Sequence, residues 1–277
     1  MLRKGDLTQG GITGTLLHFT LPMLVGSFLQ QCYNIADTLI VGQCIGAGAL
    51  AAVGSAYTLM VFLISVLLGL AMGSGTVFSL HYGAGNHVAL RRSIFSSFVL
   101  IGIVTLILNV AVFVWLGPIL RLLQVPQDIY GMMRSYLWII FCGIVFTFIY
   151  NFYASLLRAV GDSVTPLWFL AVSVVLNIAL DLFFILQLDW GIQGAAAATV
   201  LAQGVAALGI IIYTYRRRPE LRWHHEDMCF DRTCLKEIAS FSTLTCVQQS
   251  VMNLGILMVQ GLVNSFGTAV MAAFAAA

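Results

Sequence analysis

Long apolar runs alternate with short polar breaks along the whole 277-residue chain. The runs exceed the roughly 20 residues that a helix needs to cross a bilayer, and they lack the two-residue alternation of barrel strands. Since backbone groups cannot stay unpaired in hydrocarbon, runs of this kind are expected to be helical. Breaks at charged residues, Gly and Pro predict seven spans, at residues 15–41, 50–80, 93–116, 130–157, 164–186, 192–215 and 238–266. The pattern therefore predicts an all-α polytopic membrane protein.

Composition excludes a soluble domain. Hydrophobic residues make up 60% of the chain and charged residues only 9%, whereas soluble domains carry about 25% charged residues. Arg3 and Lys4 precede the first apolar run, but that run is long and contains Gln, Asn and Asp. It therefore predicts a retained helix and not a cleaved signal peptide.

The basic residues predict the orientation. If the N-terminus is cytoplasmic, only Arg121 and Arg134 of the 13 basic residues lie on or near the outside. The inside set is Arg3, Lys4, Arg91, Arg92, Arg158, Arg216, Arg217, Arg218, Arg222, Arg232 and Lys236. The positive-inside rule then predicts a multi-pass plasma-membrane protein with a cytoplasmic N-terminus. The run 216–218 also fits a patch that binds anionic lipid.

The polar stretch 216–236 is the natural boundary between two bundles. Residues 45–52 (IGAGALAA) are echoed by residues 266–273 (FGTAVMAA), with an offset of 221 throughout. Because six spans precede the second copy, both copies must point the same way, as in a parallel transporter repeat. We expect residues 1–215 to form a six-helix N-terminal lobe, 216–236 a cytoplasmic inter-lobe loop, and 237–277 the start of a second lobe. The chain then reads as a fragment of a two-lobe protein.

Acidic residues are the most informative polar positions. Of the 11 acids, only Asp37 and Asp181 lie within predicted spans, and no Lys or Arg lies deep in a span to pair with them. A carboxylate in hydrocarbon costs at least about 2.5 kcal/mol, so such residues usually face a protein interior and serve function. An Asp near a helix end that reaches water is the structural alternative.

Polar neighbours follow both acids at helical spacing. On the first predicted helix, Gln30, Asn34 and Asp37 fall at i, i+4 and i+7, and Tyr33 borders this stripe. Pro22 precedes Asp37 by 15 residues on the same helix, where it fits either a hinge for a gate or a static kink.

The fifth and sixth predicted helices add further oxygen donors. Ser173, Asn177 and Asp181 fall at i, i+4 and i+8, and the sixth helix offers Thr199 and Gln203 among Gly and Ala. Thr199 and Gln203 also fit simple interhelical hydrogen bonding between closely packed helices. Two carboxylates with Asn and Thr oxygens suit a hard cation such as Na⁺, and buried acids can equally exchange protons. Spacing does not separate these two uses.

The cysteines indicate no separate metal centre. Cys229 and Cys234 share a loop with His224 and His225, but the spacing fits a zinc site poorly and favours an ordinary polar loop. The remaining cysteines lie in or at the edge of apolar runs, where Cys behaves as a small hydrophobe.

Several stretches resemble the MATE (multidrug and toxic compound extrusion) family, including its DinF-like and NorM-like members. They follow one another along nearly the whole chain: LP (21–22), DTLIVG (37–42), AAVG (51–54), GLAMGSG (69–75), YGAGN (82–86), LRAVGDSVTP (157–166), NIALD (177–181) and GIQGAAAAT (191–199). The resemblance implies twelve helices in two six-helix bundles, and exchange of Na⁺ or H⁺ for organic, mostly cationic, drugs. The C-terminal lobe beyond its first helix would then be a missing partner. A carrier of this kind is not an enzyme, and no cofactor or nucleic acid partner is expected.

The resemblance also implies site residues. The coupling cation would be held by Asp37, Asn177, Asp181 and Thr199. Our candidates for contact with the exported compound are Gln30, Tyr33, Asn34, Asn151 and Gln203.

Two other functions remain as alternatives. A lipid-linked oligosaccharide flippase of a related exporter family would need basic residues in its cavity to hold pyrophosphate, and none lies deep in these spans. A membrane aspartyl protease could use two Asp on different helices. Such enzymes carry a Gly-x-Gly-Asp motif, which the segment 159–162 does not supply.

Overall fold

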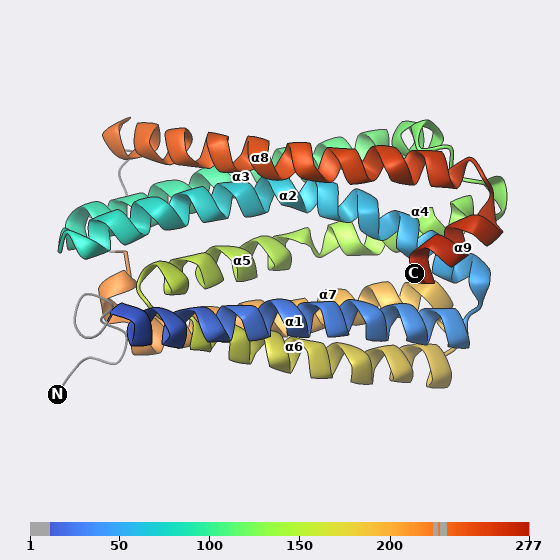
Figure 1. The fold of residues 1–277 in the computed structure, drawn as a ribbon, viewed down its shortest axis with the longest axis horizontal. Helices are drawn as coiled ribbons and strands as arrows, with labels where there is room; N and C mark the ends of the chain where they lie inside the picture. The colour runs from blue at the N-terminus through green and yellow to red at the C-terminus, as the bar shows by residue number, and fades with distance from the viewer. Residues whose placement is uncertain (1–11, 224–226, 228–231, 277) are drawn as a thin grey trace.

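The protein is described by a computed structural model that covers residues 12–223, 227 and 232–276. All regular structure in this part of the chain is helical, which confirms the predicted all-α fold (Figure 1). The elements are α1 (Ile12–Cys44), α2 (Ala47–Gly83), α3 (His87–Leu122), α4 (Gln127–Cys142), α5 (Ile144–Ala159), α6 (Val164–Leu182), the π-helix η1 (Phe183–Gln187), α7 (Gly191–Arg217), the 3₁₀-helix η2 (Pro219–Leu221), α8 (Arg232–Asn264) and α9 (Thr268–Ala276).

Most of the predicted spans are helices of membrane-crossing length. Among the described residues, α2, α3, α6 with η1, α7 and α8 are long and apolar enough to cross a bilayer, and α4 with α5 makes a sixth crossing if the bent pair is one span. Helix α1 has 33 residues, which is long enough to cross a bilayer, but it is not among the helices that meet the length and hydropathy criteria within the described residues. Its crossing therefore stays a prediction.

The fourth span differs from the prediction, because 130–157 is not one continuous helix. Helices α4 and α5 meet at Gly143 with a bend of 49°. The Phe141 carbonyl at this break accepts a hydrogen bond from Asn109 Nδ2 of α3 at 3.1 Å. A Cβ at Gly143 would overlap the side chain of Val200 on α7, so the glycine admits α7 at this point. A glycine and a side chain inserted at the break are both known causes of sharp helix kinks.

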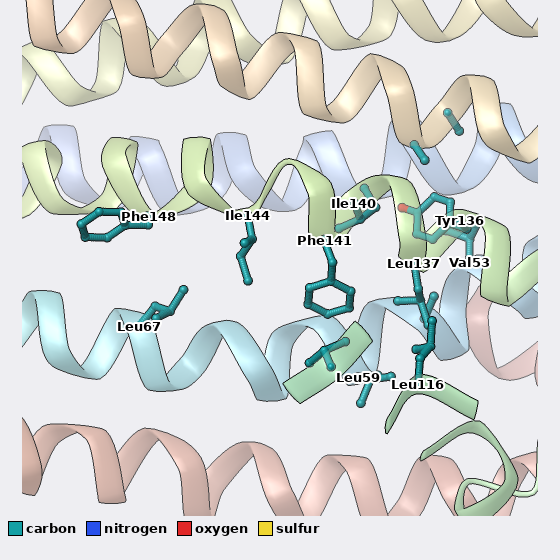
Figure 2. Close-up of a cluster of buried hydrophobic side chains, with 14 of the residues drawn as sticks. Val53, Leu59, Leu67, Leu116, Tyr136, Leu137, Ile140, Phe141, Ile144 and Phe148 are labelled. Atoms are coloured by element: carbon teal, nitrogen blue, oxygen red, sulfur yellow. The ribbon is translucent and has the colours of Figure 1, made fainter. Parts of the chain in front are cut away.

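Helix α2 lies at the centre of the core and packs against α3, α4, α5 and α8. Figure 2 shows Leu59 and Leu67 of α2 facing Phe141, Ile144 and Phe148 across the break between α4 and α5. All five side chains are buried. The apolar packing thus runs along α2 on both sides of the bend.

The contact between α2 and α8 uses small residues, and the two helices run side by side for most of their length (Figure 1). Gly69 and Gly73 of α2 lie against Cys246 and Ser242 of α8 so closely that a Cβ at either glycine would overlap the facing backbone. Ser242 Oγ also donates to the Leu70 carbonyl at 3.2 Å. Small residues at a helix contact permit this close approach in membranes.

The echo between residues 45–52 and 266–273 has a structural counterpart. Gly46 has φ 119° and Gly267 has φ 90°, values that favour glycine. Each glycine carbonyl accepts the first hydrogen bond of the helix that follows. Leu50 N–H donates to the Gly46 carbonyl at 3.1 Å, and Met271 N–H donates to the Gly267 carbonyl at 3.1 Å. The α1–α2 and α8–α9 turns therefore share a positive-φ glycine at the start of the next helix, whereas the division into lobes stays a prediction.

Helix direction separates the described basic residues. Arg91 in the first turns of α3 and the run 216–218 at the end of α7 lie at one end of the bundle, and Arg121 at the end of α3 lies at the other (Figure 1). This segregation supports the orientation argument, while the side that faces the cytoplasm stays a prediction. Arg3 and Lys4, and likewise the loop residues His224, His225 and Cys229, lie outside the described part of the chain.

Candidate functional site

The two membrane acids meet between α1 and α6. Asp37 comes from the last third of α1 and Asp181 from the last turn of α6, and their carboxyl groups lie close enough to interact with each other. The exposed fraction is 8% for Asp37 and 0% for Asp181. Two carboxyl groups can share a hydrogen bond only if one of them holds a proton. Otherwise a cation must lie between them to offset their repulsion.

Asn177 and Thr199 complete this cluster. Asn177 lies one helical turn before Asp181 on α6, and Thr199 lies on α7, which packs against α6. With its amide nitrogen toward Asp181, Asn177 donates to Asp181 Oδ2 at 2.9 Å, and its oxygen accepts from Thr199 Oγ1 at 3.3 Å and Thr199 N at 3.2 Å. In the opposite orientation the amide oxygen would face only acceptors and the amide nitrogen only donors, so this orientation is preferred. Three helices therefore contribute to one buried polar cluster.

Two tyrosines border the acids. The hydroxyl of Tyr33 on α1 lies 3.4 Å from Thr199 Oγ1 on α7. Tyr136 approaches from α4 and lies close enough to interact electrostatically with Asp37, Asp181 and Tyr33. Tyr33 was predicted from its place beside the α1 stripe, but as a contact for the exported compound. Tyr136 was missed, and its only sequence signal was a phenol within a long apolar run.

One oxygen of each of the two carboxyl groups has no hydrogen-bond partner within the protein. Asp37 Oδ1 and Asp181 Oδ1 are both buried and accept no hydrogen bond. Neither acid takes part in any of the ion pairs formed among the described residues. That part of the chain also holds no group of three or more His, Cys, Asp or Glu residues placed to share a metal ion. The donor set is thus two carboxylates, an amide and hydroxyls, which suits a proton or a hard monovalent cation better than a transition metal.

The end of α6 is irregular next to the site. After Leu182 the α-helix gives way to the π-helical segment η1, which the sequence analysis did not predict. Single π-helical turns are rare and are found frequently at functional sites. The apolar segment 182–186 carried no breaker that could have revealed it.

The predicted contacts for an exported compound are divided between two places. On α1, Gln30 is exposed, and Asn34 donates to the Tyr57 hydroxyl at 3.1 Å. Across the bundle, Gln203 of α7 hydrogen-bonds Thr147 of α5. Gln203 therefore also makes the interhelical hydrogen bond that the sequence left open as its alternative role.

Asn151 lies on this second side, where its Nδ2 donates to the Thr147 carbonyl one turn earlier on its own helix. The substrate candidates therefore do not form one cluster in the described chain. The four cation candidates do. Helix α1 also continues through Pro22 without a break.

The chain is similar in sequence to known membrane transport proteins. The family profile described as MatE matches residues 22–183. The probable multidrug resistance protein YpnP of Bacillus subtilis is 32% identical over 99% of this chain and 61% of its own length. The multidrug export protein MepA of Staphylococcus saprophyticus is 31% identical over 73% of this chain and 45% of its own length. The chain thus spans less than two thirds of the length of these relatives.

Solved structures show the same fold. A structure described as the outward-facing conformation of a multidrug resistance MATE family transporter aligns with a TM-score of 0.86 at 23% identity, over 92% of this chain and 57% of the other. The Vibrio cholerae MATE transporter VcmN in the bent form aligns with a TM-score of 0.80 at 27% identity, over 95% of this chain and 59% of the other. Because the profile match covers more than half of its residues, the chain belongs to the MatE family, a family of membrane transporters and not of enzymes.

Proposed function

We propose that this chain provides the cation-coupled N-terminal lobe of an antiporter that exports organic, mostly cationic, drugs. In this proposal residues 1–215 form the lobe, 216–236 link it to a second lobe, and 237–277 begin that second lobe. The relatives named as multidrug resistance and export proteins support drug export. The coupling ion is Na⁺ or H⁺, held by Asp37, Asn177, Asp181 and Thr199.

The observation that carries this proposal is the buried pair of carboxyl groups without a basic partner. Asp37 and Asp181 each keep one buried oxygen with no hydrogen-bond donor. Leaving buried charged groups unsatisfied costs several kcal/mol, so the pair must be neutralised by something that enters and leaves. A proton or Na⁺ meets that requirement, and an imposed ion gradient then supplies the free energy for export.

The same contacts suggest how ion binding reaches the drug. Without the ion, repulsion between Asp37 and Asp181 pushes α1 away from α6. Helix α1 also carries Tyr33, which reaches Thr199, and Asn34, which reaches Tyr57 on α2. A shift of α1, with Pro22 as its flexible point, therefore alters these contacts as well. Drug and ion would then disfavour each other, which is the coupling that exchange requires.

A lipid-linked oligosaccharide flippase is less well supported. Such a carrier needs basic side chains facing its cavity to hold pyrophosphate. Of the basic residues that the structure describes, Arg91, Arg158 and Arg216 lie in the terminal turns of their helices, and none joins the acidic cluster.

The test is gradient-driven efflux by the gene in its native context, expressed in an efflux-deficient bacterium. An imposed Na⁺ or pH gradient should drive export of ethidium, and Asp37→Asn and Asp181→Asn should each lower it by at least about tenfold, the effect of roughly 1.4 kcal/mol. Asp189→Asn is the matched control, because Asp189 is exposed and has φ 51°, a conformation that Asn tolerates well. Normal efflux in both site variants would refute the assignment. Export of an anionic lipid-linked sugar without any cationic dye would favour the flippase.

A further inference from the structure

A hollow opens at the end of α7 that carries the run of arginines. It has a volume of 510 Å³ and is lined by Tyr153 of α5 and by Ile211, Ile212, Tyr215 and Arg216 of α7. Its walls change in character along α7: the isoleucines lie about one turn before Arg216, toward the middle of the helix. The hollow thus combines an apolar wall, two phenol rings and one guanidinium. It also lies away from α8, which runs along the opposite side of the bundle (Figure 1).

The neighbouring arginines already have partners inside the protein. Arg218 Nη2 donates to Asp162 Oδ2 at 3.2 Å, and Arg218 Nη1 lies 3.6 Å from Glu220 Oε1. Burial alone would lower the pKa of Arg218, but the hydrogen bond and charge of Asp162 outweigh it and raise the pKa above its usual value. Arg222 donates from Nε to the Tyr215 carbonyl at 2.6 Å and so covers an end carbonyl of α7.

Arg216 and Arg217 differ from these two residues. Both side chains are exposed, and neither forms an ion pair with any residue that the structure describes. Arg216 lines the hollow, whereas Arg217 does not. One guanidinium is therefore available to a ligand beside an apolar hollow at the end of α7, and its neighbour in sequence provides a natural comparison.

We propose that this hollow binds one anionic phospholipid, with the phosphate on Arg216 and an acyl chain on Ile211 and Ile212. The charge requirement comes from the unpaired guanidinium, which binds phosphate oxygens in a bidentate manner. The lipid requirement comes from the apolar wall below it, which a soluble phosphate would leave uncovered. Tyrosines at the level of the headgroups are typical of membrane interfaces, and basic pockets between helices on the cytoplasmic side are known to bind anionic headgroups.

The test uses the purified 277-residue chain in detergent, with lipid adducts counted by native mass spectrometry. Phosphatidylglycerol and phosphatidylcholine with identical acyl chains are titrated separately. The wild-type chain should retain phosphatidylglycerol in preference to phosphatidylcholine. Arg216→Gln should weaken phosphatidylglycerol binding about fivefold, as expected for one arginine near an anionic headgroup. Arg217→Gln removes the same charge from the same segment and should leave the binding unchanged.

A second variant tests the apolar part of the site without changing the charge. Ile212→Trp fills the hollow from an exposed position on α7, so it should lower the retention of both lipids. Equal retention of the two lipids by the wild-type chain would overturn the proposal. Equal losses in Arg216→Gln and Arg217→Gln would also overturn it, because they would indicate diffuse charge and not a site. Unchanged binding in Ile212→Trp would exclude the hollow.

Discussion

Two buried polar clusters lie within the helical bundle, and they differ in how their hydrogen bonds are satisfied. The acidic cluster joins α1, α6 and α7 through Asp37 and Asp181. The second cluster, here called the α2–α8 polar cluster, consists of Ser55, Thr58, Gln260 and Asn264, and all four side chains are buried. Both place polar atoms where water does not reach. Only the second cluster is neutral at every position.

The α2–α8 polar cluster satisfies itself. Ser55 Oγ donates to Asn264 Oδ1 at 2.7 Å, and Gln260 Nε2 donates to both Ser55 Oγ and Asn264 Oδ1 at 2.8 Å. Thr58 Oγ1 donates to Gln260 Oε1 at 3.2 Å, and Asn264 Nδ2 donates to the Leu123 carbonyl at 2.9 Å. No side-chain atom of this cluster is left buried without a partner.

The acidic cluster, by contrast, keeps one unsatisfied oxygen on each Asp. A complete network of neutral groups holds helices together, whereas an incomplete network of acids requires a ligand. In the proposed function, the α2–α8 polar cluster therefore holds its helices together and the acidic cluster exchanges the ion. Substitutions in each cluster should consequently affect different measurements.

The largest expected effect is on ion binding at the acidic cluster. Asp181→Asn removes one of the two charges, so the affinity of the purified chain for the coupling ion should fall at least about 100-fold. The thermal stability of the ion-free chain should stay the same or rise, since a buried like charge is lost. Isothermal titration calorimetry and a thermal melt measure the two quantities, with Asp189→Asn as control. Unchanged ion binding in Asp181→Asn would remove the distinction between the clusters.

The second effect should appear in stability and not in ion binding. Asn264→Ala removes the bonds to Ser55, Gln260 and Leu123 and leaves their partners buried, which should destabilise the chain by about 1–2 kcal/mol. Ion affinity should match that of the wild-type chain. Gln248→Ala is the control, because Gln248 lies on the same helix but is exposed. A loss of ion affinity in Asn264→Ala would show that the two clusters are coupled.

The sequence predicted the acidic cluster better than the α2–α8 polar cluster, for a physical reason. A charge within an apolar run is costly wherever it lies, so Asp37 and Asp181 could be recognised without knowledge of the fold. Neutral residues such as Ser55 and Asn264 are tolerated on many helix faces, and their pairing depends on which helices touch. The pairing of α2 with α8 joins segments about 200 residues apart, and no local pattern encodes it.

Helix positions were predicted well and helix irregularities poorly. Apolar length alone places a span, which is why most predicted spans fall within the observed helices, although the span 130–157 crosses the break at Gly143 and the span 238–266 runs two residues past the end of α8. The break at Gly143 depends on Asn109 of α3 and Val200 of α7, two residues that are distant in sequence. The place of Tyr136 beside the acids likewise depends on the direction of α4, which ends at that bend. Such features arise from packing and cannot be read from one segment.

The smallest expected effect separates two threonines on one helix. Thr199 and Thr214 are both buried on α7, and each hydroxyl oxygen lies within hydrogen-bonding distance of the carbonyl one turn earlier, at 3.0 Å and 2.8 Å. Only Thr199 also contacts Asn177 and Tyr33. Thr199→Val keeps the shape but removes the hydroxyl, so it should weaken ion affinity about tenfold, the effect of roughly 1.4 kcal/mol from losing one proposed oxygen ligand.

Thr214→Val removes an equivalent hydroxyl outside the cluster and should leave ion affinity unchanged. Thr214→Val gives the cost of the bond to the helix alone, and Thr199→Val should melt at a slightly lower temperature because it also loses the contacts with Asn177 and Tyr33. Calorimetric titration of the two variants side by side isolates the contribution of the site from that of the helix. Equal ion affinities in Thr199→Val and Thr214→Val would show that α7 supports the two acids only by packing, and the ion would then be held by α1 and α6 alone.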